Sequence, residues 1–245
     1  MPPNHQPGHA RRAPVRDPDR LERDGFALFT DFLSGGEIDL LKQAAVGGMI
    51  QVLRRDGAAF GGRNLLNAPA FRELSRSERM RELVEPLIGT DAIAVRVLFF
   101  DKTREANWPV SWHQDLSLAV REQHDLPGWG PWSVKAGVVH VQPPPAVLAT
   151  MLTVRLHLDD CDVENGPLRV LPGTHCLGRL SRDQTASLRR STPEVACLAP
   201  AGSALLMRPL LLHASGRAHR PGHRRVIQIE FAPAGILPPP LAWAQ

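Results

Sequence analysis

The chain has 245 residues, 43% of them hydrophobic and 22% charged, which is the balance of a globular protein with enough length for one domain and a full core. Its net charge of +4 is small, and no zinc-finger spacing or RNP-like aromatic motif accompanies it, so we predict no nucleic-acid partner. No run of 18 or more apolar residues occurs, which excludes a predicted membrane-spanning helix.

The ends of the chain differ in composition from its middle. Residues 1–20 are rich in Pro, Arg and His and lack the apolar core of a secretory signal, so we predict a flexible arm. Residues 21–232 are predicted to form the domain, and the Pro-rich residues 233–245 a loosely ordered tail. The three cysteines are odd in number and lack C-x-x-C spacing, which argues against a disulfide framework or a structural zinc site and indicates a cytoplasmic protein.

Two helices are predicted in the first part of the domain, after a short apolar strand at Gly25–Phe29. Ser34 and Glu37 have the spacing of a capping box and open the first helix. The second is expected from Ala68 to Leu87, where Gly89 stops it. One side of the first helix is apolar, with Ile38, Leu41, Ala45 and Met49.

A strong strand follows at Ala92–Phe100, and then a long segment without regular periodicity at Leu116–Thr150. A loop of this length in a compact domain is usually functional, so we predict a lid. Trp129 and Trp132 lie in it. They either wall a substrate cleft or pack the loop onto the domain, and the sequence leaves both open.

The rest of the domain consists mainly of predicted strands. Met151–Asp159 alternates between apolar and polar residues, which indicates a half-buried strand. A polar surface helix is expected at 181–190, and further strands at 168–171, 194–198, 203–207, 210–213 and 224–231. Helices first and about eight strands later predict an α+β fold whose core is a β-sandwich or barrel.

Two H-x-D pairs are candidate metal ligands, His113 with Asp115 and His157 with Asp159. Residues i and i+2 of a strand point to the same face, so either pair offers an imidazole and a carboxylate to one point. A further histidine would complete the facial triad of non-heme Fe(II). His213, at the end of an apolar run, is a candidate, although a histidine there more often packs the strand end.

Arg224 lies eleven residues beyond His213, with turn residues between them, so a hairpin would bring the two side by side. A fixed guanidinium near an iron site suits a dicarboxylic co-substrate because it binds a carboxylate through two hydrogen bonds. Ser215, on the same face as His213, offers a hydroxyl to that carboxylate.

The motifs W-H-Q-D at 112–115, N-G-P-L-R-V-L-P-G-T-H at 165–175 and H-A-S-G at 213–216, followed by Arg224, resemble the phytanoyl-CoA dioxygenase family of Fe(II)/2-oxoglutarate oxygenases. The resemblance covers roughly residues 19–231 and implies a double-stranded β-helix, or jelly roll, flanked by N-terminal helices. It also implies a site: iron ligands His113, Asp115 and His213, with Arg224, Ser215 and Arg155 around 2-oxoglutarate.

By this resemblance the protein uses Fe(II), 2-oxoglutarate and O2 to hydroxylate an unactivated C–H bond of a small-molecule metabolite, releasing succinate and CO2. It would act as a monomer or homodimer. Two alternatives stay open: a cupin-type metal enzyme that does not use 2-oxoglutarate, and a non-enzymatic binding module. Candidate substrate contacts are Trp129, Trp132, Lys135 and His140.

Overall fold

The computed structural model describes residues 18–47, 51–55 and 57–244. Most of the helices precede most of the strands, as the sequence predicts. The helical elements are α1 (Pro18–Asp24), α2 (Gly35–Gly47), η1 (Leu65–Asn67), α3 (Pro69–Arg76), α4 (Glu78–Ile88), α5 (Pro145–Ala149), η2 (Thr174–Leu177) and α6 (Arg182–Ser191).

The strands form three sheets in which every pairing is antiparallel. A seven-stranded sheet has the order β1 (Phe26–Phe29), β12 (Ala204–Met207), β9 (Leu152–His157), β14 (Arg224–Pro233), β4 (Ala92–Lys102), β3 (Ala58–Arg63) and β2 (Gln51–Arg55). A four-stranded sheet has the order β11 (Val195–Cys197), β10 (Leu168–Val170), β13 (His213–Ser215) and β5 (Val110–His113). A small sheet has the order β6 (Leu118–Val120), β8 (Val138–Val141) and β7 (Trp132–Lys135).

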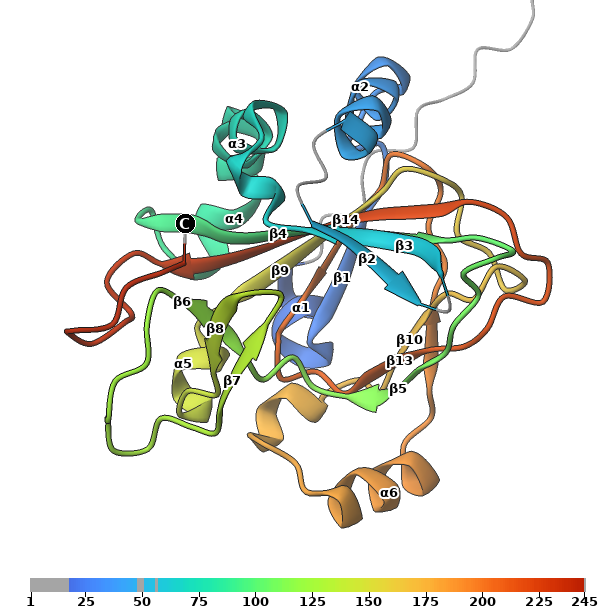
Figure 1. Ribbon diagram of the computed structural model, residues 1–245. Helices are drawn as coiled ribbons and strands as arrows, with labels where there is room; N and C mark the ends of the chain where they lie inside the picture. The colour runs from blue at the N-terminus through green and yellow to red at the C-terminus, as the bar shows by residue number, and fades with distance from the viewer. Residues whose placement is uncertain (1–17, 48–50, 56, 245) are drawn as a thin grey trace, which may run out of the picture.

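The seven-stranded sheet has one face under the helices and the other toward the four-stranded sheet, as Figure 1 shows with α2, α3 and α4 on one side and β5, β10 and β13 on the other. Alternate side chains of its long strands serve the two faces. Val97 and Phe99 of β4 belong to the helix-covered core, as do Ile227 and Ile229 of β14. Two antiparallel sheets facing each other form the predicted jelly roll.

The side chains between these positions point to the space between the two sheets. Arg96, Leu98, Phe100 and Lys102 of β4 line one cavity there. The strand register explains why these residues face the cavity. Arg224 of β14 pairs with Lys102 of β4, and every second residue along each strand from this pair points to the same side. Polar side chains are therefore gathered on one face of a strand pair whose other face is apolar.

The predicted helix over 68–87 is two helices. Ser77 separates α3 from α4, and its hydroxyl accepts a hydrogen bond from the Met80 amide at 3.3 Å. A serine that caps the second helix breaks the chain into two helices but leaves the spacing of the apolar residues unchanged, so the sequence pattern looks like one helix. The break lets Phe71 and Val84 both reach the core. Gly89 follows α4 with φ of 102°, as predicted for the residue that stops it.

The segment Leu116–Thr150 is not irregular, contrary to the prediction. It carries the small sheet and α5, and Leu118, Val141 and Leu148 are buried in a second apolar cluster. The C-terminal tail is also more ordered than predicted. Leu241 and Trp243 are buried, and Trp243 forms a β-bridge with Val120, so the tail packs against this small sheet. Short strands separated by Gly and Pro give no long periodic signal, which is why the pattern was missed.

Two smaller expectations also need correction, and one hairpin was not expected. The strand at Met151–Asp159 is not half-buried, because all six residues of β9 are buried between the helices and the second sheet. The strand expected at 210–213 begins only at His213. The hairpin β2–β3 was not predicted. The predicted capping box is confirmed, since the Ser34 amide donates to the Glu37 carboxylate at 2.8 Å. Met49 and most of the predicted N-terminal arm lie outside the described residues.

Candidate active site

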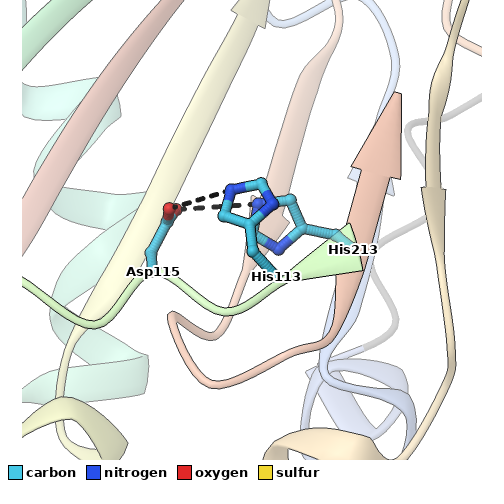
Figure 2. Close-up of side chains that lie close together, drawn as sticks. All are labelled: His113, Asp115 and His213. Atoms are coloured by element: carbon cyan, nitrogen blue, oxygen red, sulfur yellow. Dashed lines mark ion pairs between the residues drawn. The ribbon is translucent and has the colours of Figure 1, made fainter. Parts of the chain in front are cut away.

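Two facing histidines and one aspartate come together at the edge where β5 meets β13. His113 is the last residue of β5 and pairs in register with His213, the first residue of β13. Asp115 follows two residues after His113 and turns its carboxylate toward both rings, as Figure 2 shows. The three potential ligand atoms all lie within 4.8 Å of one another, which is the spacing of a shared metal. Within the part of the chain that the structure describes, no other group of three such side chains meets this criterion.

Each imidazole is oriented by a hydrogen bond from its other nitrogen. The Nδ1 of His113 donates to the Ser111 carbonyl, and the Nδ1 of His213 donates to the Leu211 carbonyl, both at 2.8 Å. These bonds turn each Nε2 toward the carboxylate, at 3.6 Å and 3.9 Å from the Asp115 oxygens, which is the position from which it can share a metal ion with Asp115. Metal-binding histidines in proteins are usually oriented in this way.

The electrostatics of the triad also suit a divalent cation. Burial by itself would raise the pKa of Asp115, but His213, His113 and Arg96 together hold it well below its usual range. Burial lowers the pKa of His213 to about 4, so this ring is neutral and its Nε2 can act as a ligand. A carboxylate with two imidazoles is the donor set of non-heme Fe(II), and these residues fit that ion.

Gln114, which lies between His113 and Asp115 in the sequence, fixes the segment that carries these two candidate ligands. Its side-chain amide donates to the Gly178 and Leu210 carbonyls at 2.8 and 2.7 Å and accepts from the Leu180 amide at 2.8 Å. The Asp115 amide donates to the Pro209 carbonyl at 2.9 Å. The ligand-bearing segment is therefore tied to the residues that precede His213.

The rival H-x-D pair, His157 and Asp159, belongs to no such group of three potential ligands among the described residues. Asp159 lies beyond the end of β9, where it accepts hydrogen bonds from Arg225 and forms an ion pair with Lys42. His157 is buried inside the sheet, and burial lowers its pKa to about 3. His157 is buried within the sheet and Asp159 is bound by basic side chains at the strand end, although their spacing in the sequence matches that of His113 and Asp115.

A cavity of about 250 Å³ joins the triad to Arg224, a buried residue of β14 in the seven-stranded sheet. The Nε of Arg224 has no hydrogen-bond partner within the described residues. An orphaned donor on a buried guanidinium costs free energy unless a ligand accepts from it. Ser215 and Arg155, the other two residues assigned to 2-oxoglutarate, line the same cavity.

Lys102 stands beside Arg224 and was not identified from the sequence. Its Nζ donates to the Ser215 hydroxyl at 3.0 Å, and the hydroxyl donates in turn to the Gly166 carbonyl at 3.0 Å. Gly166 has φ of 72°, and a Cβ there would lie 2.7 Å from the Gly216 carbonyl oxygen. Burial and the neighbouring Arg224 charge lower the pKa of Lys102 to about 7. The sequence carried no local signal for this role, because β4 is covered on both sides and does not alternate clearly.

Of the four candidate substrate contacts, two line a cavity beside the triad and two do not. Lys135 and Trp132 line a second cavity of about 410 Å³ that shares His113 and Asp115 with the first. Trp129 instead packs against the apolar cluster under the small sheet. His140 is buried and lies 3.3 Å from Arg96, so it supports that side chain and does not line either cavity.

Comparison with known proteins places this geometry in a family. The family model described as phytanoyl-CoA dioxygenase (PhyH) matches residues 21–226, which is most of the chain. The chain belongs to the phytanoyl-CoA dioxygenase family. Membership makes it an enzyme of the Fe(II)/2-oxoglutarate-dependent oxygenases, with Fe(II) and 2-oxoglutarate as its cofactors. No curated protein sequence matches it.

Solved structures share the fold of this family member at low sequence identity. AviO1 from Streptomyces viridochromogenes Tue57 is 22% identical with a TM-score of 0.66, over 95% of this chain and 100% of the other. EctD from S. alaskensis with bound Fe is 18% identical with a TM-score of 0.69, over 91% and 79%. SnoN, a non-heme α-ketoglutarate-dependent epimerase from nogalamycin biosynthesis, is 19% identical with a TM-score of 0.64, over 89% and 81%. In the described ranges of the present chain, no helix is long and apolar enough to cross a membrane.

Proposed function

We propose that the protein hydroxylates an unactivated C–H bond of a small-molecule metabolite, converting 2-oxoglutarate and O2 into succinate and CO2. The observation that carries this proposal is one continuous cavity with His113, Asp115 and His213 on one side and the buried Arg224 on the other. The reaction needs a metal with free coordination positions and a fixed cation that binds the co-substrate, and the two sides of this cavity offer both.

The residues of the site have separate tasks in this proposal. His113, Asp115 and His213 hold Fe(II), and they leave the remaining positions to the two substrates. Arg224 binds the distal carboxylate of 2-oxoglutarate through its planar fork, and Ser215 donates to the same carboxylate once it turns from the Gly166 carbonyl. Lys102 holds the Ser215 hydroxyl in place. Bound Fe(II) with 2-oxoglutarate and O2 supplies the oxidant that removes the substrate hydrogen.

The protein contributes orientation and exclusion of water. The small sheet and the segment that leads into it line the cavity next to Asp115, with Trp132 of β7 and with Leu116 and Ser117 just before β6. A substrate seated there presents one C–H bond to the metal while the side chains around it displace water. The seven-stranded sheet and its helices keep the opposite side rigid, as the long pairing of β4 with β14 shows.

The test is an anaerobic titration with Fe(II), followed by 2-oxoglutarate, read by the visible charge-transfer absorption of the complex. We expect stoichiometric iron binding and a new absorption when 2-oxoglutarate is added. A panel of candidate metabolites is then screened in air for succinate formation. Iron binding that 2-oxoglutarate does not perturb, together with turnover that does not need it, would favour the cupin-type alternative.

A further inference from the structure

Strand β4 presents two basic side chains to the cavity, Arg96 near the middle of the strand and Lys102 at its last residue. Arg96, Leu98, Phe100 and Lys102 face it from alternate positions. Lys102 lies six positions beyond Arg96, which at the rise of a β-strand is about 20 Å. The five-carbon chain of 2-oxoglutarate is much shorter than this. A co-substrate held by Arg224, beside Lys102, leaves the Arg96 end without a ligand.

Arg63 and Lys135 stand at the Arg96 end, on β3 and on β7. Both line the cavity that contains the triad, and Lys135 also lines the adjoining one. Ser117, between the metal centre and Lys135, accepts a hydrogen bond from the lysine Nζ at 2.9 Å. The two cations come from separate sheets and flank the approach to Asp115.

The carboxylates near these cations are already engaged. Arg96 binds both oxygens of Glu230, one through Nε at 2.9 Å and the other through Nη2. Asp115 belongs to the metal triad. Within the described residues neither Arg63 nor Lys135 forms a salt bridge with any carboxylate. This end of the cavity therefore carries a surplus of positive charge.

This surplus is unfavourable in the free protein. Burial and the charge of Arg96 lower the pKa of Arg63, and burial together with Arg96 and Arg63 lowers the pKa of Lys135. Arg63 is half-buried and Lys135 is exposed, so the repulsion between them costs the fold little. An anion bound between these cations would relieve that repulsion and find two positive donors at the mouth of the cavity.

We propose that the substrate carries an anionic group, a carboxylate, phosphate or sulfate, which Arg63 and Lys135 bind while its reacting carbon lies at the metal. Arg63 offers a planar fork and Lys135 a compact ammonium, the pair of donors that such oxyanions accept. Arg96, which lines the same cavity, is held in place by its ion pair with Glu230 and by its contact with His140. This inference rests on the proposed function, since it assigns the substrate of that same site.

The first experiment uses three simple anions as probes. The protein is loaded anaerobically with Fe(II) and saturating 2-oxoglutarate, so that the Arg224 end is filled, and is titrated calorimetrically with inorganic phosphate, sulfate or acetate. We expect at least one of the three to bind, and its dissociation constant to rise at least tenfold in Arg63→Gln and in Lys135→Gln. Arg182→Gln, which removes an exposed arginine of α6, is the control and should bind the anion as the wild type does.

The charge-transfer absorption of the Fe(II)–2-oxoglutarate complex separates the two proposals. It should form equally in all variants, because neither Arg63 nor Lys135 contacts the triad or Arg224. If it does not form in the wild type, the proposed function fails. If it forms but no probe binds, or the probes bind all variants equally, the anion assignment is overturned.

The second experiment tests the substrate directly. Candidate metabolites are offered in matched pairs, a carboxylic acid with its primary amide and a phosphate or sulfate ester with its parent alcohol, and succinate is measured. The anionic member of a pair should support turnover, and which pair responds distinguishes the three oxyanions. A neutral member that turns over as fast as its anionic partner would overturn the inference.

Discussion

Replacing Asp159 by alanine tests which H-x-D pair is the metal site. In the structure the Asp159 carboxylate accepts from the Arg225 amide at 2.9 Å and from the Arg225 Nε and Nη2 at 2.8 Å. It also pairs with the Lys42 Nζ at 3.0 Å. These contacts join the end of β9 to β14 and α2. We therefore expect Asp159→Ala to weaken the fold and to leave Fe(II) binding unchanged.

The size of the effect follows from these contacts. A hydrogen bond to a charged group contributes about 1.5–3 kcal/mol, and removing one partner of a buried ion pair costs about 3–5 kcal/mol. The side chain of Asp159 is 15% exposed and that of Arg225 is 24% exposed, so solvent screens part of the interaction. We expect a loss of about 3 kcal/mol in the free energy of unfolding. In a chain of this size that loss lowers the Tm by roughly 6–12 °C.

The stability effect should also depend on pH. Burial by itself raises the pKa of Asp159, but the hydrogen bonds from Arg225 and Lys42 lower it overall. The unfolded chain has the ordinary aspartate pKa of about 3.9. The carboxylate therefore stabilises the fold above that pH, and the contribution is lost as the pH falls through the lower pKa of the folded protein. The Tm difference between wild type and Asp159→Ala should be full near pH 7 and shrink below about pH 4.

The assay compares Asp159→Ala with Asp115→Ala under identical conditions. Thermal unfolding gives the Tm of each metal-free protein, and the anaerobic Fe(II) titration gives its iron stoichiometry. Asp115→Ala should lose iron binding because one of three ligands is gone. Loss of iron binding in Asp159→Ala with an unchanged Tm, while Asp115→Ala still binds iron, would refute the ligand assignment.

Three further predictions follow from the same geometry. Arg224→Leu should raise the dissociation constant of 2-oxoglutarate about 10- to 150-fold, the equivalent of about 1.5–3 kcal/mol, whereas Arg225→Leu should lower the Tm and leave that constant unchanged; a larger loss of affinity at Arg225 would move the assignment to the neighbouring residue. Gln114→Ala should reduce the free energy of unfolding by about 2–3 kcal/mol, because three backbone groups lose their partner; a change below about 0.5 kcal/mol in chemical denaturation would contradict this. Turnover of the true substrate in saturating chloride should give no halogenated main product by mass spectrometry, since the Asp115 carboxylate fills the position at which a halide would bind.

Local patterns in the sequence determined much of the fold. Runs rich in apolar residues placed β4 and β14. The predicted capping residue Ser34 starts α2, and the polar helix expected at 181–190 is α6, which begins at Arg182. These signals depend only on neighbours within a few residues, which is why one sequence suffices to find them.

The order of the motifs also brought His113, Asp115, His213 and Arg224 to attention, through resemblance to a family. Spacing alone did not separate this H-x-D pair from His157 and Asp159. The distinction is tertiary, because it depends on which strand lies opposite. His113 faces His213 across β5 and β13, whereas Asp159 meets Arg225 at the outer end of β9.

The walls of the site were decided by the tertiary structure alone. Lys102 and Arg96 lie on a strand that is covered on both sides, so polarity and alternation do not show which side is the cavity. Arg63 and Lys135 come from a hairpin and from a small sheet whose short strands carry almost no periodic signal. Charges so far apart in sequence meet only when separate sheets close over one space. The sequence by itself thus determined the strands and the ligand types, and the packing of sheet on sheet decided which charges face the substrate.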